Sequence, residues 1–108
     1  MTISLDLIEQ AAYRFALLGD PTRLRIMNAL MACRELSVGD IARAANTSRF
    51  NASAHLNRLA AAGMLARRRA GTTVYYRVND VNLPRVCDWM CESVRDRART
   101  LAGSGSTP

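Results

Sequence analysis

Apolar residues recur every three or four positions over most of the chain, which is the spacing of one face of an α-helix. Four segments show this pattern, at 5–18, 21–32, 48–62 and 83–101, and a shorter one spans 38–45. The repeating positions of the first segment are Leu5, Ile8, Ala12, Phe15 and Leu18, and those of the last are Leu83, Cys87, Met90, Val94 and Leu101. The pattern predicts a chain that is mainly helical.

Capping residues mark where these helices begin. Asp20 before Pro21 is a typical helix start, with the carboxylate as N-cap and proline in the first turn. Ser37 and Ser48 take the N-cap position before the third and fourth helices. Asn46 tolerates the left-handed conformation that a tight turn between those two helices requires.

After Gly63 the repeat of apolar positions changes from 3.6 residues to two, which indicates β-strands. Residues 65–69 and 73–78 are predicted strands, and Gly71 supplies a positive φ in the turn at 70–72. Residues 35 and 36 are expected to be only a connector. Alternation puts one set of side chains, Val74, Tyr76 and Val78, on one face and another, Thr73, Tyr75 and Arg77, on the opposite face.

Two short helices joined by a tight turn form a helix-turn-helix, and a basic hairpin directly after them forms a wing. The predicted fold is therefore mainly α with a small β-hairpin: a winged helix-turn-helix with four helices before the hairpin and one after it. Residues 1–102 are expected to form this one domain. Residues 103–108 read Gly-Ser-Gly-Ser-Thr-Pro and are expected to be a disordered tail.

Charge changes this picture because it is confined to one segment. The chain has 15 basic residues, all of them arginine, and 9 acidic ones, for a net charge of +6. Residues 47–77 contain six of the arginines and no acid, whereas the segments on either side are each neutral. A neutral scaffold that carries one basic block is typical of a protein that binds nucleic acid.

Other classes of function find little support. His55 is the only histidine, so it has no partner for acid–base or triad chemistry, and we interpret it as a residue of helix packing or backbone hydrogen bonding. No phosphate loop, nucleophile elbow or pair of carboxylates indicates an enzyme. No apolar run reaches the length of a membrane span, and no secretion signal is recognised, so a cytoplasmic protein with reduced cysteines is expected.

Local strings of the sequence, in their order along the chain, resemble the ArsR/SmtB family of bacterial winged-helix repressors. The matching strings are "LGDPTRLRIMNAL" (18–30), "ELSVGDIA" (35–42), "TSRFNASAHLNRLAAAGML" (47–65) and "RRRAGTTVYYRV" (67–78). The resemblance implies a sequence-specific transcriptional regulator of double-stranded DNA. It also implies a homodimer through the first and last helices. The apolar faces of these two helices support the same conclusion, because the core of one small domain cannot cover both faces.

Such a dimer would place two reading helices in successive major grooves of an imperfect palindrome, about 10 base pairs apart or a multiple of that. A winged-helix module that binds another protein is the alternative. The acid-free arginine block disfavours that alternative, because an adaptor needs no such field.

The resemblance implies that positions 49, 50, 53 and 54 face base edges. Arg49 is the best candidate for a bidentate contact with guanine, while Phe50 and Ala54 indicate contacts with thymine methyl groups. Ser48 and Asn51 suit a phosphate or the helix start. The wing is expected to reach the DNA backbone or minor groove. The predicted DNA-binding residues are Ser48, Arg49, Phe50, Asn51, Ser53, Ala54, Asn57, Arg58, Arg68, Arg69 and Thr72.

Relatives commonly sense metals, but their ligands are largely missing here. A family site at the start of the third helix uses a Cys-Val-Cys-Asp string, whereas this chain has Ser-Val-Gly-Asp at 37–40. A second family site corresponds to positions 80, 82, 93 and 96, where both imidazoles are lost. Borderline metals prefer imidazole or thiolate. The remaining weak candidates for metal ligands are Asp80, Asp96, Cys87 and Cys91.

Cys87 and Cys91 lie one helical turn apart, which places them on one face of the last helix. Packing in the dimer interface is the favoured interpretation of the pair, because cysteine is by default a small buried hydrophobe. Soft-metal or arsenite sensing and redox or persulfide sensing are alternatives, and so is a regulator without a ligand whose response depends on a partner protein. The sequence indicates no required cofactor. A metal ion is the only cofactor that Cys87 and Cys91 could hold.

Overall fold

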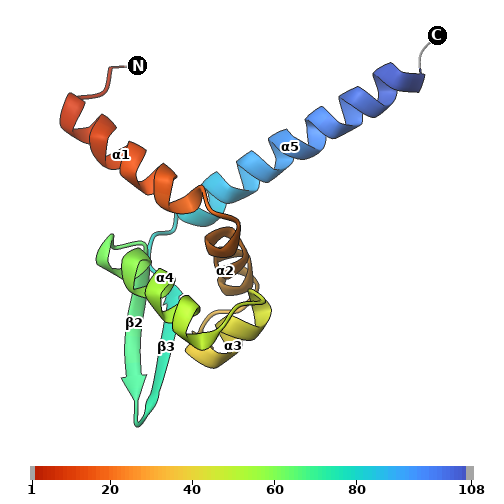
Figure 1. Ribbon diagram of the computed structural model, residues 1–108. Coiled ribbons are helices and arrows are strands. Elements are labelled where there is room, and N and C mark those ends of the chain that lie inside the picture. The colour runs from red at the N-terminus through yellow and green to blue at the C-terminus, as the bar shows by residue number, and fades with distance from the viewer. Residues whose placement is uncertain (1, 107–108) are drawn as a thin grey trace.

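The computed structural model describes residues 2–106 and has the predicted order of helices, with the hairpin before the last one (Figure 1). The elements are α1 (Leu5–Leu18), α2 (Pro21–Ala32), β1 (Leu36–Ser37), α3 (Val38–Ala44), α4 (Arg49–Ala61), β2 (Leu65–Ala70), β3 (Thr73–Val78) and α5 (Leu83–Ser106). This confirms the predicted winged helix-turn-helix. The helix ends before α5 lie within a residue or so of the predicted ones.

The predicted N-caps are present. In α2, α3 and α4 the cap oxygen accepts a hydrogen bond from the backbone N–H three residues further on. The lengths of these bonds are 3.0 Å for Asp20 to Arg23, 3.2 Å for Ser37 to Asp40 and 3.0 Å for Ser48 to Asn51. Asn46 has a φ of 54°, so it forms the predicted left-handed turn between α3 and α4.

The sheet has three strands in the order β1-β3-β2, one more than predicted. Residues 36 and 37 pair antiparallel with Tyr76 and Tyr75 of β3, so the expectation of a simple connector was wrong. A strand of two residues shows no alternation in the sequence. It forms because α3 begins beside β3, whose free edge then takes up the backbone groups of the preceding residues.

The hairpin is tighter than predicted. Ala70 pairs with Thr73, which leaves a loop of only two residues, Gly71 and Thr72. Gly71 has a φ of 63°, and glycine is the residue that takes a positive φ at the first loop position without strain. The extra pair lengthens the wing by one residue on the β2 side.

The core lies among α2, α3, α4 and the inner face of β3 (Figure 1). On α4, three apolar residues at helical spacing, Ala52, Leu56 and Leu59, are fully buried. Tyr76 is only 2% exposed, and its hydroxyl donates a hydrogen bond of 3.1 Å to Oδ1 of Asn57. The inner face of the wing is thereby fastened to α4.

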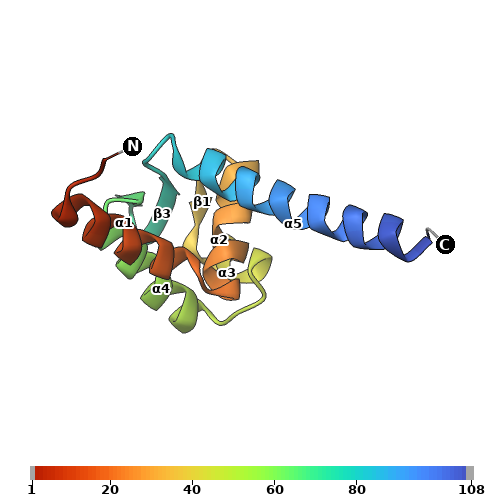
Figure 2. The same cartoon turned by 90° about the horizontal axis from the view of Figure 1, so that it is seen from above.

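Helices α1 and α5 leave this core as two diverging arms, and α5 reaches far beyond it (Figure 2). The radius of gyration is 16.6 Å, whereas a compact chain of this length has about 13 Å. None of the described helices is both long and apolar enough to cross a lipid bilayer. The arms carry large apolar side chains on their exposed surface, including Leu5, Ile8, Phe15, Trp89, Met90 and Val94.

The last helix is longer than predicted. It continues past Leu101 to Ser106, so the part of the expected disordered tail at 103–106 is helical. Once a helix exists, each further residue adds a backbone hydrogen bond without a new nucleation step, which favours this extension. Residues 107 and 108 of the expected tail lie outside the described residues.

Candidate nucleic-acid interface

The predicted DNA-binding residues gather on α4, on β2 and in the hairpin loop, on the side of the molecule away from the two arms (Figure 1). The start of α4 and the hairpin tip border one surface hollow. The lining residues of this hollow are Val38, Arg49, Phe50, Ser53, Thr72, Thr73 and Val74. The fold therefore brings predicted residues of the helix and of the wing onto a shared surface.

On α4 the exposed and buried faces are clearly separated. Phe50 is 89% exposed, and Ala54, Asn57 and Arg58 are also exposed, whereas Ser53 is half-buried beside the hollow. An exposed phenylalanine at this position is unusual, because burial of the ring would remove apolar surface from water.

The first turn of α4 is held by its own side chains. Ser48 accepts the cap hydrogen bond described above, and Nδ2 of Asn51 donates to the hydroxyl of Thr47 at 2.7 Å. Of the two predicted roles for Ser48 and Asn51, the structure therefore shows the one at the helix start. The backbone N–H groups of this first turn still make a favourable site for a phosphate.

The guanidinium group of Arg49 lies over the start of α3. A Cβ atom built on Gly39 would stand 3.5 Å from Nη2 and 3.6 Å from Nε of this arginine. The absent side chain of Gly39 leaves the room that the guanidinium occupies. Arg49 is exposed, but its guanidinium lies toward α3. It is therefore beside the face of α4 that carries Phe50 and Ala54.

The three arginines of β2 divide between the two faces of the hairpin. Arg67 and Arg69 stand opposite Tyr76 and Val74, while Arg68 stands opposite Tyr75 on the other face. Arg69 is exposed close to the hairpin tip, where it can approach a ligand of the wing.

Arg68 is bound by an acid from outside the basic block. Its Nε and Nη2 donate to the carboxylate of Glu35 at 2.7 to 3.1 Å, and its guanidinium carbon lies 4.6 Å from the centroid of the Tyr75 ring. The hydrogen bond from Arg68 lowers the pKa of Glu35 below its ordinary value. Charge counting along the sequence missed this pair, because its members lie on β2 and just before β1.

His55 joins α4 to α2. Its Nδ1 accepts a hydrogen bond of 3.0 Å from Nε of Arg23, whose Nη1 also donates to the carbonyl of Leu17 at the end of α1. The predicted role in packing and hydrogen bonding is confirmed, although the partner is a side chain and not the backbone. No periodic signal could have found this bond, since its partners are 32 residues apart.

The side chains at the two family metal sites have other partners. Ser37 Oγ caps α3, and Asp40 forms an ion pair with Arg43. Asp96 pairs with Arg99 at 2.8 Å. Within residues 2–106, no three His, Cys, Asp or Glu side chains stand close enough together to hold a metal ion. The donor set does not fit a metal at either site.

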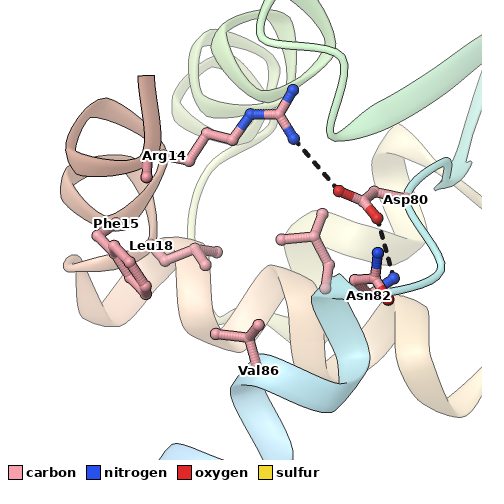
Figure 3. Close-up of a pocket in the computed structure, with 8 residues that line it drawn as sticks. Arg14, Phe15, Leu18, Asp80, Asn82 and Val86 are labelled. Atoms are coloured by element: carbon pink, nitrogen blue, oxygen red, sulfur yellow. Dashed lines mark hydrogen bonds and ion pairs between the residues drawn. The ribbon is translucent and has the colours of Figure 1, made fainter. Parts of the chain in front are cut away.

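The remaining carboxylate of the second site, Asp80, belongs to a pocket of about 150 Å³ between α1 and the start of α5 (Figure 3). It accepts a hydrogen bond of 3.2 Å from Arg14 and one of 2.9 Å from the backbone N–H of Asn82. The walls below this ion pair are apolar and include Phe15, Leu18 and Val86. Asp80 thus connects the two arms at their base, a role that the sequence did not reveal.

The cysteines differ in their surroundings. Cys87 is buried in the core, whereas Cys91 and Cys33 are exposed. Burial raises the pKa of the Cys87 thiol, and the neighbouring Cys91 and Asp88 add to this effect. A raised pKa disfavours the thiolate, which is the form that binds metals and reacts with oxidants.

Known proteins resemble this chain in sequence and in structure. A family model described as "Bacterial regulatory protein, arsR family" matches residues 20–67. The chain is 42% identical over 95 residues to the transcriptional repressor SmtB homolog of Synechocystis. The alignment covers 84% of this chain and 71% of that protein.

Two solved structures extend the similarity to the arms. The antimony-specific transcriptional repressor AntR superposes with a TM-score of 0.83 at 26% identity, over 92% of this chain and 89% of AntR. A homodimeric winged helix-turn-helix DNA-binding domain of Mycobacterium bovis superposes with a TM-score of 0.78 at 29% identity, over 88% and 87% of the two chains.

Proposed function

Since the chain belongs to the ArsR/SmtB family of DNA-binding transcriptional regulators, we propose that it is a homodimeric repressor that reads an imperfect palindrome with α4 and the wing. The observation that carries this proposal is the acid-free arginine segment 47–77, which forms both α4 and the hairpin. The SmtB homolog of Synechocystis is itself called a transcriptional repressor. We infer a role in gene regulation rather than in catalysis, and the membership of the family supports it.

Exposed apolar surface on the arms supports the dimer. Leu5 of α1 is 78% exposed and Trp89 of α5 is 71% exposed, and both belong to helices that project from the core. A second copy of the chain would remove this surface from water, because a two-fold axis brings the same apolar patch of each copy into contact. The matching domain of Mycobacterium bovis is described as homodimeric.

The dimer is tested by measuring molar mass with light scattering after size exclusion. The measured mass of the wild type should be twice the chain mass of 11.9 kDa. Trp89→Glu should shift the mass toward the monomer, because it would bury a charge in the interface. Val81→Glu, which changes a similarly exposed apolar residue before α5, serves as the control. A monomeric wild type at micromolar concentration would contradict the proposal.

We assign sequence reading to α4 and backbone binding to the wing. Arg49→Ala should relax the preference for the operator over random duplex, because Arg49 stands beside the base-reading positions. Arg69→Ala should weaken binding to all duplexes and flatten the dependence of log affinity on log salt by about one unit per protomer. Gel shifts with random and selected duplexes across a salt series measure both effects, and equal effects of the two mutations would contradict this division.

The same gel shifts test the alternative of a protein-binding module. A DNA-binding protein with this charge should bind random duplex at low salt and lose affinity steeply as salt increases. An adaptor would bind no duplex at any salt concentration.

The inducer is a separate question, for which α5 suggests a second candidate. Cys87 and Cys91 lie one turn apart, and AntR is named as antimony-specific, so a soft metalloid bound by two thiolates is the candidate to test. Our favoured assignment is packing, because Cys87 is buried and its pKa is raised. Operator binding is titrated with zinc, nickel, arsenite and oxidant for wild type and for Cys87→Ser with Cys91→Ser.

The titration separates three outcomes. Release of the wild type by arsenite, and not of the serine variant, supports the thiolate site. Release by oxidant alone supports redox sensing. Identical binding under every condition supports a regulator without a ligand, whose occupancy on DNA is determined by a partner sensor protein or by its own concentration.

A further inference from the structure

A short apolar stripe, made of Phe50 and Ala54, lies on the outward face of the first turns of α4 in the middle of the basic surface. Both residues are exposed and lie four residues apart on one helix face, which continues with the exposed polar residues Asn57 and Arg58. They stand opposite the buried residues Ala52 and Leu56. A reading helix would normally present polar side chains along such a line, because most groups on base edges form hydrogen bonds.

The proposed dimer does not cover this stripe. The arms that would form the interface point away from α4 and the hairpin (Figure 1). The charges that residues 47–77 place around the stripe are all positive: Arg49 and Arg58 lie on the same helix and Arg69 on the neighbouring wing, and this segment contains no acid. The ligand of this face must therefore combine phosphate groups with an apolar group at the centre.

In the major groove of B-DNA the one apolar group on the base edges is the C5-methyl group of thymine, and methylation gives cytosine the same group. We propose that Phe50 and Ala54 read C5-methyl groups of pyrimidines in the operator. This inference rests on the proposed DNA-binding function and names the feature of the DNA that the same surface recognises. Phe50 supplies the broad apolar contact, and the small Ala54 lets the helix approach a base edge closely.

The position of Arg49 is consistent with this arrangement. Its guanidinium is held over Gly39 on α3, so it stands beside the stripe and not on it. From there it can reach the DNA backbone or a base pair next to the methylated one. The central positions of each half-site are therefore left to the two apolar residues, and the arginine adds discrimination at its flank.

The expected effect follows from the size of a methyl group. Removing one buried methyl group from the contact should weaken binding about fourfold, the factor that corresponds to the burial of a single CH₂ unit. A dimer meets the group twice, once in each half-site, so replacing one symmetric thymine pair should weaken binding about sixteenfold.

The test first selects an operator from a pool of random 30-base-pair duplexes and then removes methyl groups from it. Deoxyuridine replaces each thymine in turn, which deletes the C5-methyl and leaves every hydrogen-bonding group unchanged. At cytosines of the half-site, 5-methylcytosine is compared with cytosine. Affinity is measured by fluorescence anisotropy, and the two replacements show whether thymine or methylated cytosine is the source of the recognised methyl group.

Variants connect the effect to the stripe. Phe50→Ala should lower affinity for the thymine operator and abolish the difference between thymine and deoxyuridine, whereas Phe50→Leu should retain part of that difference. Because Phe50 is exposed, neither change should alter the melting temperature. Val81→Ala truncates another exposed apolar residue, outside α4, and should leave the difference intact.

The possible outcomes distinguish a failure of methyl reading from a failure of the proposed DNA-binding function. Equal affinity for methylated and unmethylated duplexes, with binding that still depends on salt, would overturn methyl reading and leave DNA binding in place. A preference for thymine that survives in Phe50→Ala would also overturn it. If no duplex binds at any salt concentration, both proposals are refuted.

Discussion

Replacing Glu35 with glutamine should strengthen binding to every duplex, because it releases Arg68. The carboxylate of Glu35 accepts three contacts from this guanidinium, between 2.7 and 3.1 Å long. Glutamine has nearly the same shape but no charge, so it cannot retain the arginine in the same way. Arg68 is partly exposed at the side of the wing, from which a long side chain can turn toward a phosphate.

The size of the effect follows from counting phosphates. Each contact between an arginine and a phosphate contributes about 0.9 to the slope of log affinity against log salt. A dimer that gains one such contact per protomer should therefore steepen the slope by about 1.8. Between 200 and 50 mM salt this difference should multiply the affinity of the variant, relative to wild type, about twelvefold.

Fluorescence anisotropy with a random duplex at four salt concentrations measures the slope. Glu92→Gln is the matched control, since Glu92 also pairs with arginines, Arg95 at 2.9 Å and Arg99 at 3.3 Å, but on α5 away from the wing. Equal steepening in both variants would mean that net charge alone is responsible. An unchanged slope in Glu35→Gln would show that Arg68 does not reach a phosphate, and would remove it from the DNA-binding residues.

Further predictions concern stability and reactivity. Leu56→Ala, which empties a fully buried site on α4, should lower the free energy of unfolding by about 2–5 kcal/mol in urea titrations at fixed protein concentration, and a loss under about 1 kcal/mol would contradict the assigned core. Arg23→Lys should lose a hydrogen bond to Leu17 or His55, because one ammonium cannot replace both guanidinium donors, and should reduce stability by about 1 kcal/mol. Iodoacetamide should leave Cys87 unmodified until the protein unfolds, because burial raises its pKa; a third adduct on the intact mass of the native protein would refute this. Finally, because the pKa of Glu35 is lowered, its ion pair stabilises the fold at neutral pH, and this contribution is lost as acid protonates the carboxylate. Glu35→Gln should therefore lose less stability than wild type upon acidification.

The features that the sequence predicted well are those that depend on neighbours along the chain. Helix starts at Asp20, Ser37 and Ser48 need only one side chain and the backbone N–H three residues on. The inward residues of α4 follow from the helical repeat alone. Such local rules extend over a single turn or strand, so a single sequence is enough to apply them.

The features that it missed depend on residues far apart. β1 exists because β3 offers a free edge beside the start of α3, and two residues cannot show a repeat. The pairs Arg68–Glu35 and Arg14–Asp80 join positions 33 and 66 residues apart. An ion pair has no signature in charge counts, since opposite charges contribute in the same way whether or not they touch. The distribution of charge along the sequence therefore predicted where the candidate site lies. The ion pairs within it depend on the three-dimensional fold and could not be predicted.

The string Asp20-Pro21-Thr22-Arg23 belongs to the first of the strings that resemble the family, and it lies outside the predicted DNA-binding residues. Its acid caps α2, its proline fits the first turn, and its arginine donates to Leu17 at the end of α1 and to His55 on α4. One side chain thus connects the arm that would form the dimer to the helix that would read DNA. If α1 moves when the dimer changes, Arg23 is a direct physical route by which α4 can follow. Arg23→Lys should then weaken operator binding by more than its loss of stability explains, and binding that falls only in proportion to the unfolded fraction would refute this coupling.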